Sequence, residues 1–120
     1  MTPALKGVHC ATVDDLVNWA PDGDEMCVWL ELSIGPADGD AADLFQVCIA
    51  TQSGLKAAPR SIKARDGVKA RPIVLREYSW GAVQGAIRNR LGSCSGADWT
   101  EIQQKLRRQF DWVHEKQKSV

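Results

Sequence analysis

The stretch CVWLELSIGPADGDAADLFQVCIAT, residues 27–51, decides the fold that the sequence predicts. Its first eight residues alternate strictly between two sets of side chains. Neighbouring side chains of a β-strand point to opposite faces of the sheet, so this alternation predicts a half-buried strand over residues 27–34. One face carries Val28, Leu30, Leu32 and Ile34, and the other carries Cys27, Trp29, Glu31 and Ser33.

A second strand follows after a loop rich in turn-forming residues. Leu44 and Cys48 make one face of this strand only partly polar, and the opposite face is fully apolar. Two strands joined in this way predict an antiparallel hairpin with a long loop. The side chains of the apolar face are Phe45, Val47 and Ile49, and the turn-forming residues are Gly35, Pro36 and Gly39.

Two more strands are expected outside the hairpin. Residues 5–10, near the start of the chain, are a plausible first strand, and residues 71–78, RPIVLREY, predict another. Pro72 keeps the second of these short, because proline is confined to the first residues and the edges of strands.

After Ser79 the apolar period changes to that of a helix. Ser79 and Asp98 are suitable N-cap residues, and Glu101 follows Asp98 at the spacing of a capping box. Apolar residues at spacings of three and four then lie on one face of each predicted helix. The first apolar stripe is Trp80, Val83, Ile87, Leu91 and Cys94, and the second is Trp99, Ile102, Leu106, Phe110 and Val113.

The chain has 120 residues, enough for one domain with an ordinary core. Strands that come first and helices that come last predict an α+β fold. We expect a single domain over residues 1–120. In it, a small antiparallel sheet of three to four strands includes the long-looped hairpin, and two C-terminal helices pack on one face of the sheet.

A net charge of zero conceals a strong asymmetry along the chain. Residues 1–50 hold nine acidic residues and one basic residue, a net charge of −8, and residues 51–120 have a net charge of +8. The asymmetry predicts two oppositely charged surfaces if folding keeps the two halves apart, and internal pairing if it does not.

The sequence carries no partnered set of residues of the kind that catalysis requires. His9 and His114 are the only histidines, and Cys10, beside His9, points to the opposite face of a strand. The four cysteines lack the spacing of a zinc site, and the aspartates of the hairpin loop resemble a calcium loop only weakly. We therefore expect a protein that is not an enzyme and that needs no metal or cofactor.

Carboxylates flank the first strand of the hairpin at both ends. Because an eight-residue strand is about 26 Å long, the two groups cannot form one cluster, but they can border a single partner-sized surface. Trp29 and Glu31 point outward between them if the opposite face of the strand is buried. The partner-binding residues predicted on this basis are Asp22, Asp24, Glu25, Trp29, Glu31, Asp38, Asp40 and Asp43.

Two alternatives remain open. The basic segment over residues 56–76 could make the chain a nucleic-acid-binding module, although it lacks interleaved aromatic residues and the pI of about 6.7 is low for such a protein. A homodimer that buries some of the five tryptophans is the second alternative. The basic residues concerned include Lys56, Arg60, Lys63, Arg65, Lys69 and Arg71.

The location of the protein is expected to be cytoplasmic. Its opening residues contain no apolar stretch of the length of a secretory signal, and no segment approaches the roughly 20 apolar residues that span a bilayer.

Five features follow one another along the chain: Asp14-Asp15-Leu16, Pro21 with acidic residues behind it, SIGPADGDAADLFQVCIAT, LREY before a helix, and SCSGADWTEIQQKLRRQFDW. This order resembles the immunity protein family eight of bacterial polymorphic toxin systems. In that family a Pro-Lys-Trp-Leu-like run usually follows the second hairpin strand, where this chain has TQSGL, residues 51–55. The sharpest points of similarity are Ile34-Gly35-Pro36 with Gly39, Phe45-Gln46-Val47-Cys48, Glu77-Tyr78, and Cys94, Gly96, Trp99, Glu101, Lys105, Leu106 and Trp112.

The resemblance implies a small antidote used in bacterial competition. Such a protein binds a cognate toxin or effector domain and neutralises it by blocking the active or substrate-binding surface of the toxin. An acidic surface suits a basic toxin, such as a nuclease that acts in the cytosol, because opposite charges raise the rate of association.

Overall fold

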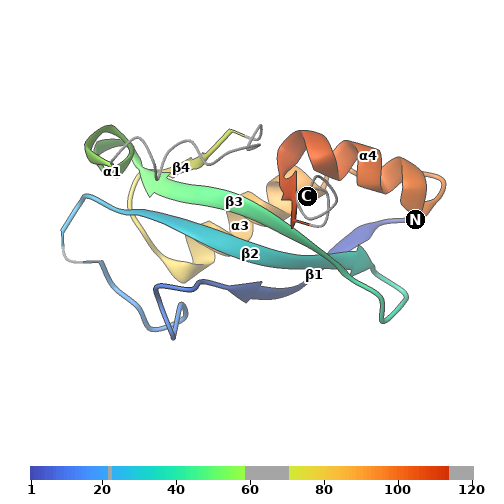
Figure 1. Ribbon diagram of the computed structural model, residues 1–120, viewed down its shortest axis with the longest axis horizontal. Coiled ribbons are helices and arrows are strands. Elements are labelled where there is room, and N and C mark those ends of the chain that lie inside the picture. Colours follow the sequence, from blue (N-terminus) through green and yellow to red (C-terminus); the bar gives the residue numbers. More distant parts are fainter. Residues whose placement is uncertain (22, 59–70, 114–120) are drawn as a thin grey trace, which may run out of the picture.

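The computed structural model describes residues 1–21, 23–58 and 71–113. Its strands form one sheet in the order β1-β2-β3-β4, and β5 also pairs with β3. Figure 1 shows α3 behind the sheet and α4 along its upper edge. The strands are β1 (Pro3–His9), β2 (Cys27–Pro36), β3 (Asp43–Thr51), β4 (Ile73–Leu75) and β5 (Asp111–Trp112), and the helices are α1 (Gln52–Ala57), α3 (Trp80–Leu91) and α4 (Trp99–Gln109). The predicted α+β fold is confirmed.

The predicted hairpin is formed by β2 and β3. These strands pair antiparallel from Cys27 opposite Ala50 to Ile34 opposite Asp43. The side chains predicted for the buried face have almost no exposed surface, apart from Val28, which is half-buried. Burial of such side chains is the main favourable term in folding, at about 1.5–3 kcal/mol for each. The buried set is Leu30, Leu32, Ile34, Phe45, Val47 and Ile49.

The sheet is mixed, whereas the sequence predicted an antiparallel one. β4 runs parallel to β3, with Ile49 opposite Ile73 and Thr51 opposite Leu75. Parallel neighbours require a crossover connection, and here the chain passes through α1 and residues 59–70, which lie outside the described residues. The strand predicted over residues 71–78 is reduced to the three residues of β4.

Helix α1 is an element that the sequence analysis did not predict. Thr51 caps it, because its hydroxyl oxygen accepts a hydrogen bond from the Gly54 N–H at 3.1 Å. The same oxygen accepts a hydrogen bond from the Met26 N–H at 3.1 Å, which ties α1 to the start of β2. A Cβ on Gly54 would lie 2.1 Å from the carbonyl oxygen of Met26, so only glycine permits this approach.

The two long helices begin at the predicted caps and cover the apolar face of the hairpin. The Ser79 hydroxyl accepts a hydrogen bond from the Ala82 N–H at 3.0 Å, and the Asp98 carboxylate accepts one from the Glu101 N–H at 2.8 Å. Each such cap stabilises its helix by about 1 kcal/mol. The helical side chains buried in the common core are Val83, Ile87, Leu91, Ile102 and Leu106.

Helix α4 ends earlier than its apolar stripe predicted. Phe110 is extended, with φ −138° and ψ 156°, and Asp111 and Trp112 pair with β3. The guanidinium of Arg90 donates hydrogen bonds to the carbonyl oxygens of Gln109 at 2.7 Å and Pro72 at 3.3 Å. Arg90 therefore joins α3 to the last turn of α4 and to the entry of β4. Burial, and secondarily the charge of Arg71, lowers the pKa of Arg90.

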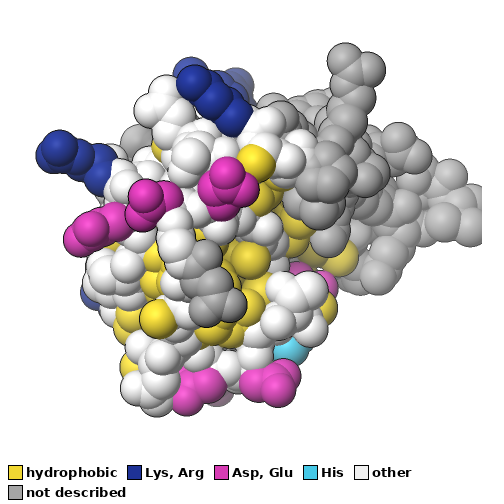
Figure 2. Space-filling view, turned by 90° about the vertical axis from the view of Figure 1, so that its left-hand side faces the viewer, with side chains coloured by type: hydrophobic (Ala, Val, Ile, Leu, Met, Phe, Trp, Pro, Cys, Tyr) yellow, Lys and Arg dark blue, Asp and Glu magenta, His cyan; other side chains and the backbone are white. Residues whose placement is uncertain are grey.

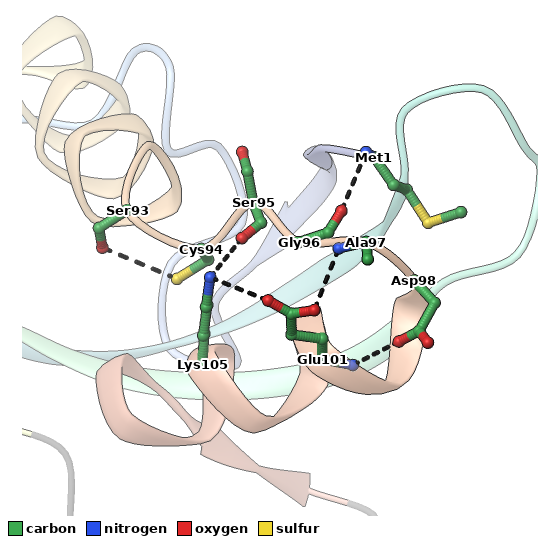
Figure 3. A network of polar contacts seen from close by, with 9 residues as sticks. All are labelled: Met1, Ser93, Cys94, Ser95, Gly96, Ala97, Asp98, Glu101 and Lys105. Carbon is green, nitrogen blue, oxygen red and sulfur yellow. Dashed lines mark hydrogen bonds and ion pairs between the residues drawn. The ribbon is translucent and has the colours of Figure 1, made fainter.

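Polar contacts hold the connection between α3 and α4 against the first residues of the chain (Figure 3). The backbones of Met1 and Gly96 pair in both directions, at 3.0 and 3.1 Å. Glu101 accepts a hydrogen bond from the Ala97 N–H at 3.2 Å and lies 3.5 Å from the ammonium of Lys105. Lys105 also donates to the carbonyl oxygen of Ser95 at 2.6 Å. These contacts give a structural role to several residues that carried the resemblance.

Gly35 is predicted to be important for stability, because a Cβ there would lie 1.8 Å from the carbonyl oxygen of Ala41. Gly35→Ala should lower the free energy of unfolding by about 2–3 kcal/mol, since the hairpin loop must move away. Chemical denaturation measures this change. Gly85→Ala, in open space on α3, is the matched control and should raise stability by about 0.5–1 kcal/mol. Equal stabilities of the two variants would contradict the prediction.

Candidate partner-binding surface

The acidic residues predicted to bind a partner lie at the two ends of the hairpin. Asp24 and Glu25 are exposed just before β2, and Asp38 and Asp40 are exposed in the loop between β2 and β3. Figure 1 shows these two segments at opposite ends of the sheet. Asp22 lies outside the described residues. The acidic residues therefore form separate groups that flank β2.

Asp43 differs from the other acidic residues because its carboxylate is used within the fold. One of its oxygens accepts hydrogen bonds from the Trp99 Nε1–H at 3.2 Å and from the Gln103 amide at 2.7 Å. These contacts fasten the first turns of α4 to the start of β3. Asp43 is half-buried as a result, and its main role is structural.

Trp29 and Glu31 share the face of β2 that points away from the helices. Their partners across the ladder are Cys48 and Gln46. Trp29 is half-buried and Glu31 is exposed. Trp29 lies nearer to Asp24 and Glu25 than to the hairpin loop, and Glu31 lies near the middle of β2.

The end of the sheet that carries Asp24 and Glu25 is hollowed. One hollow has a volume of about 310 Å³ and another about 240 Å³. Figure 2 views this end and shows hydrophobic side chains at its centre, acidic side chains to the left and below, and basic side chains above. The first hollow is lined by Trp19, Ala20, Pro21, Glu25, Met26, Cys27 and Val28. The second is lined by Val8, His9, Cys10, Val13, Asp14, Asp15, Leu16, Val17 and Trp80.

The structure thus adds members that sequence reasoning did not place in the site. Asp14 and Asp15 contributed only to the charge count and to the resemblance, and Trp19 and Val17 were not singled out. Val17 is 61% exposed, the highest value among the large apolar side chains of the described residues. Residues 10–20 have no periodic pattern, so the sequence did not indicate that they lie beside the start of β2.

Tyr78 holds residues 10–20, which line the hollowed end of the sheet. Its hydroxyl donates a hydrogen bond to the carbonyl oxygen of Leu16 at 2.9 Å, and its ring meets that of Trp19 edge-on with centroids 4.8 Å apart. Leu16 is itself part of the buried core. These contacts order a segment that has no regular secondary structure.

Asp15 keeps a negative charge on this end of the molecule. The side-chain amide of Asn18 donates a hydrogen bond to its carboxylate at 2.8 Å, and the Asn18 N–H donates another at 3.3 Å. These bonds lower the pKa of Asp15 below its ordinary value.

Other kinds of site were sought in the described part of the chain. It contains no group of three or more His, Cys, Asp or Glu residues arranged to hold a metal ion. No helix within the described ranges has the length and apolar character to cross a membrane. Of the predicted basic segment, Lys56 and Arg71 are described and exposed, whereas Arg60, Lys63, Arg65 and Lys69 lie outside the described residues.

Exposed apolar side chains bordered by carboxylates are typical of a surface that binds another protein.

Residues 3–116 match the model of the Immunity protein 8 family, so the chain belongs to that family. The resemblance seen in the sequence is therefore confirmed, and membership implies an immunity protein that acts against a toxin. No curated protein and no solved structure matches the chain.

Asp43→Ala should destabilise the protein, because the indole N–H of Trp99 and the amide of Gln103 would lose their acceptor. We expect a loss of about 1–3 kcal/mol in the free energy of unfolding. Asp38→Ala, in the exposed loop, removes the same charge and should change stability by less than about 0.5 kcal/mol. Urea denaturation of both variants tests the prediction, which is wrong if they are equally stable.

Tyr78 should titrate above its ordinary pKa of 10.0, because burial, and secondarily the negative charge of Cys10, disfavours the phenolate. The chain has one tyrosine, so ultraviolet absorbance of the phenolate reports on Tyr78 alone. The midpoint should lie above 10.0 in the folded protein and return to the ordinary value in denaturant. A raised pKa in the folded state also means that stability falls as pH rises above the unfolded value. Coincident midpoints would contradict this assignment.

Proposed function

We propose that the chain binds a cognate bacterial toxin or effector domain in the cytoplasm and neutralises it by covering the active or substrate-binding surface of the toxin. Membership of the Immunity protein 8 family supports a toxin as the partner. Inhibition of this kind needs no reaction. It requires a rigid surface of roughly 800 Å² on each partner with a few well-buried contacts at its centre.

The observation that carries the proposal is the apolar, acid-bordered end of the sheet. We place the centre of the contact at this end and on the adjoining face of β2, with Asp24, Glu25, Trp29 and Glu31 as contact residues. Asp38 and Asp40 lie about one strand length away, about 33 Å for the ten residues of β2, and belong to the rim of the same interface. Asp43 contributes by holding α4 in place.

The charge of this surface favours a basic toxin. Opposite charges on two proteins steer their encounter and raise association rates above the usual 10⁵–10⁷ M⁻¹s⁻¹ or so. Nucleases are a fitting class, because a protein that binds a phosphate backbone presents basic residues.

Co-expression tests the function directly. Cells that produce the toxin domain encoded beside this chain should grow when the chain is present and die when it is absent. The double variant Gly35→Ala/Gly54→Ala, which should not fold, is the negative control. Equal killing with and without the wild-type chain refutes the proposal.

Two matched pairs of substitutions test the location of the surface. Asp24→Asn/Glu25→Gln and Asp38→Asn/Asp40→Asn remove the same total charge from opposite ends of β2. The first pair should both slow association and speed dissociation from the toxin, each by about tenfold. The second pair should slow association alone, as expected for residues at a rim.

Binding kinetics with a catalytically inactive toxin, measured at low and high salt, separate these effects. The difference in association rate between the variants and the wild-type chain should disappear at high salt. Exposed charges are already screened beyond a Debye length of about 8 Å at physiological ionic strength. Faster dissociation caused by the second pair and not by the first would move the centre of the contact to the hairpin loop.

A further inference from the structure

The thiols of Cys27 and Cys48 lie side by side on adjacent strands. Their sulfur atoms are 3.4 Å apart, and both are reduced thiols. Cys27 stands opposite Ala50 in the ladder, and Cys48 stands opposite Trp29. The two cysteines are therefore offset by two residues and share the face of the sheet that points away from the helices.

The two thiols differ in access to solvent. Cys48 is 4% exposed, whereas Cys27 is half-buried and lines the open hollow of about 310 Å³. A small molecule that enters this hollow lies against Cys27, and the sulfur of Cys27 is 3.4 Å from that of Cys48.

We propose that Cys27 and Cys48 are a modification site at which a small-molecule disulfide, such as oxidised glutathione, produces a reversible intramolecular disulfide. The Cys27 thiolate attacks one sulfur of oxidised glutathione, which forms a mixed disulfide and releases one glutathione thiolate. The Cys48 thiolate then attacks the sulfur of Cys27 and expels the second. Two protein thiols are oxidised, one glutathione disulfide is reduced, and the two thiol protons pass to the released glutathione.

The bond requires a small movement at the end of a strand. A disulfide is about 2.05 Å long, so the sulfur atoms must approach by about 1.4 Å. An offset of two residues separates Cα atoms by about 7–8 Å in a regular ladder, slightly more than the usual span of a disulfide. Cys27 is the first residue of β2, where a shift of the backbone disturbs the fewest ladder hydrogen bonds.

Cys10 and Cys94 provide internal controls. The sulfur of Cys10 lies 3.4 Å from the hydroxyl of Thr12, and the Cys94 thiol donates to the carbonyl oxygen of Arg90 at 3.4 Å. Both are almost fully buried. Burial also raises the pKa of Cys94, which lowers its content of the reactive thiolate.

The test exposes the folded full-length chain to oxidised glutathione and stops the exchange with acid. The chain is then unfolded in denaturant and its remaining thiols are alkylated near neutral pH with N-ethylmaleimide, because acid suppresses the thiolate that alkylation requires. The intact mass should correspond to the loss of two hydrogen atoms and the addition of two alkyl groups, one on each remaining thiol. Peptide mapping should show Cys27 linked to Cys48, with Cys10 and Cys94 alkylated. A thiol reductant should restore four alkylated cysteines.

Variants test the order of the two steps. Cys48→Ser should stop the reaction at a stable mixed disulfide on Cys27, whereas Cys27→Ser should remain unmodified. Cys10→Ser should form the Cys27–Cys48 bond at the wild-type rate. Four alkylated cysteines in the treated wild-type chain, a different linkage, or glutathione retained on wild-type Cys27 would overturn the proposal. The wild-type peptide map decides the question even if a serine variant fails to fold. The inference does not depend on the proposed function.

Discussion

The need to cover one apolar face of the β2–β3 hairpin is the constraint on which the rest of the structure depends. Fully buried side chains of both strands project from this face, and exposing them would remove the largest favourable term in folding. Helices α3 and α4 cover it with the apolar stripes that follow their N-caps. Arg90 and Asp43 then set the position of the helices, because each bonds to groups on two or more elements.

The same arrangement separates acidic residues with structural roles from those available to a partner. The carboxylates of Asp43 and Asp98 both bind α4. Asp43 accepts hydrogen bonds from side chains of the helix, and Asp98 caps its N-terminus. Asp24 and Glu25 remain exposed beside an apolar end that Tyr78 keeps ordered. A protein that acts by binding needs such a pre-ordered surface, because ordering a flexible loop on association would weaken the complex.

Several residues that carried the resemblance have a physical explanation in the fold. Gly35 allows the hairpin loop to close over the end of β2, and Glu101 and Lys105 hold the connection before α4. Tyr78 tethers residues 10–20 through its contacts with Leu16 and Trp19. These positions could be recognised from the sequence, but their roles depend on contacts between segments far apart in the chain.

Local pattern determined the elements whose signals lie within a few residues: the alternation of β2, the apolar face of β3, and the caps Ser79 and Asp98. It also placed exposed carboxylates at both ends of β2. Tertiary structure decided the direction of β4, the presence of α1, the end of α4 at Gln109, and the joining of residues 10–20 to the acidic start of β2. The reason is that alternation and capping are properties of neighbouring residues. A strand's direction, a helix end held by Arg90, and a hollow lined from two segments result from interactions that form only when the whole chain has folded.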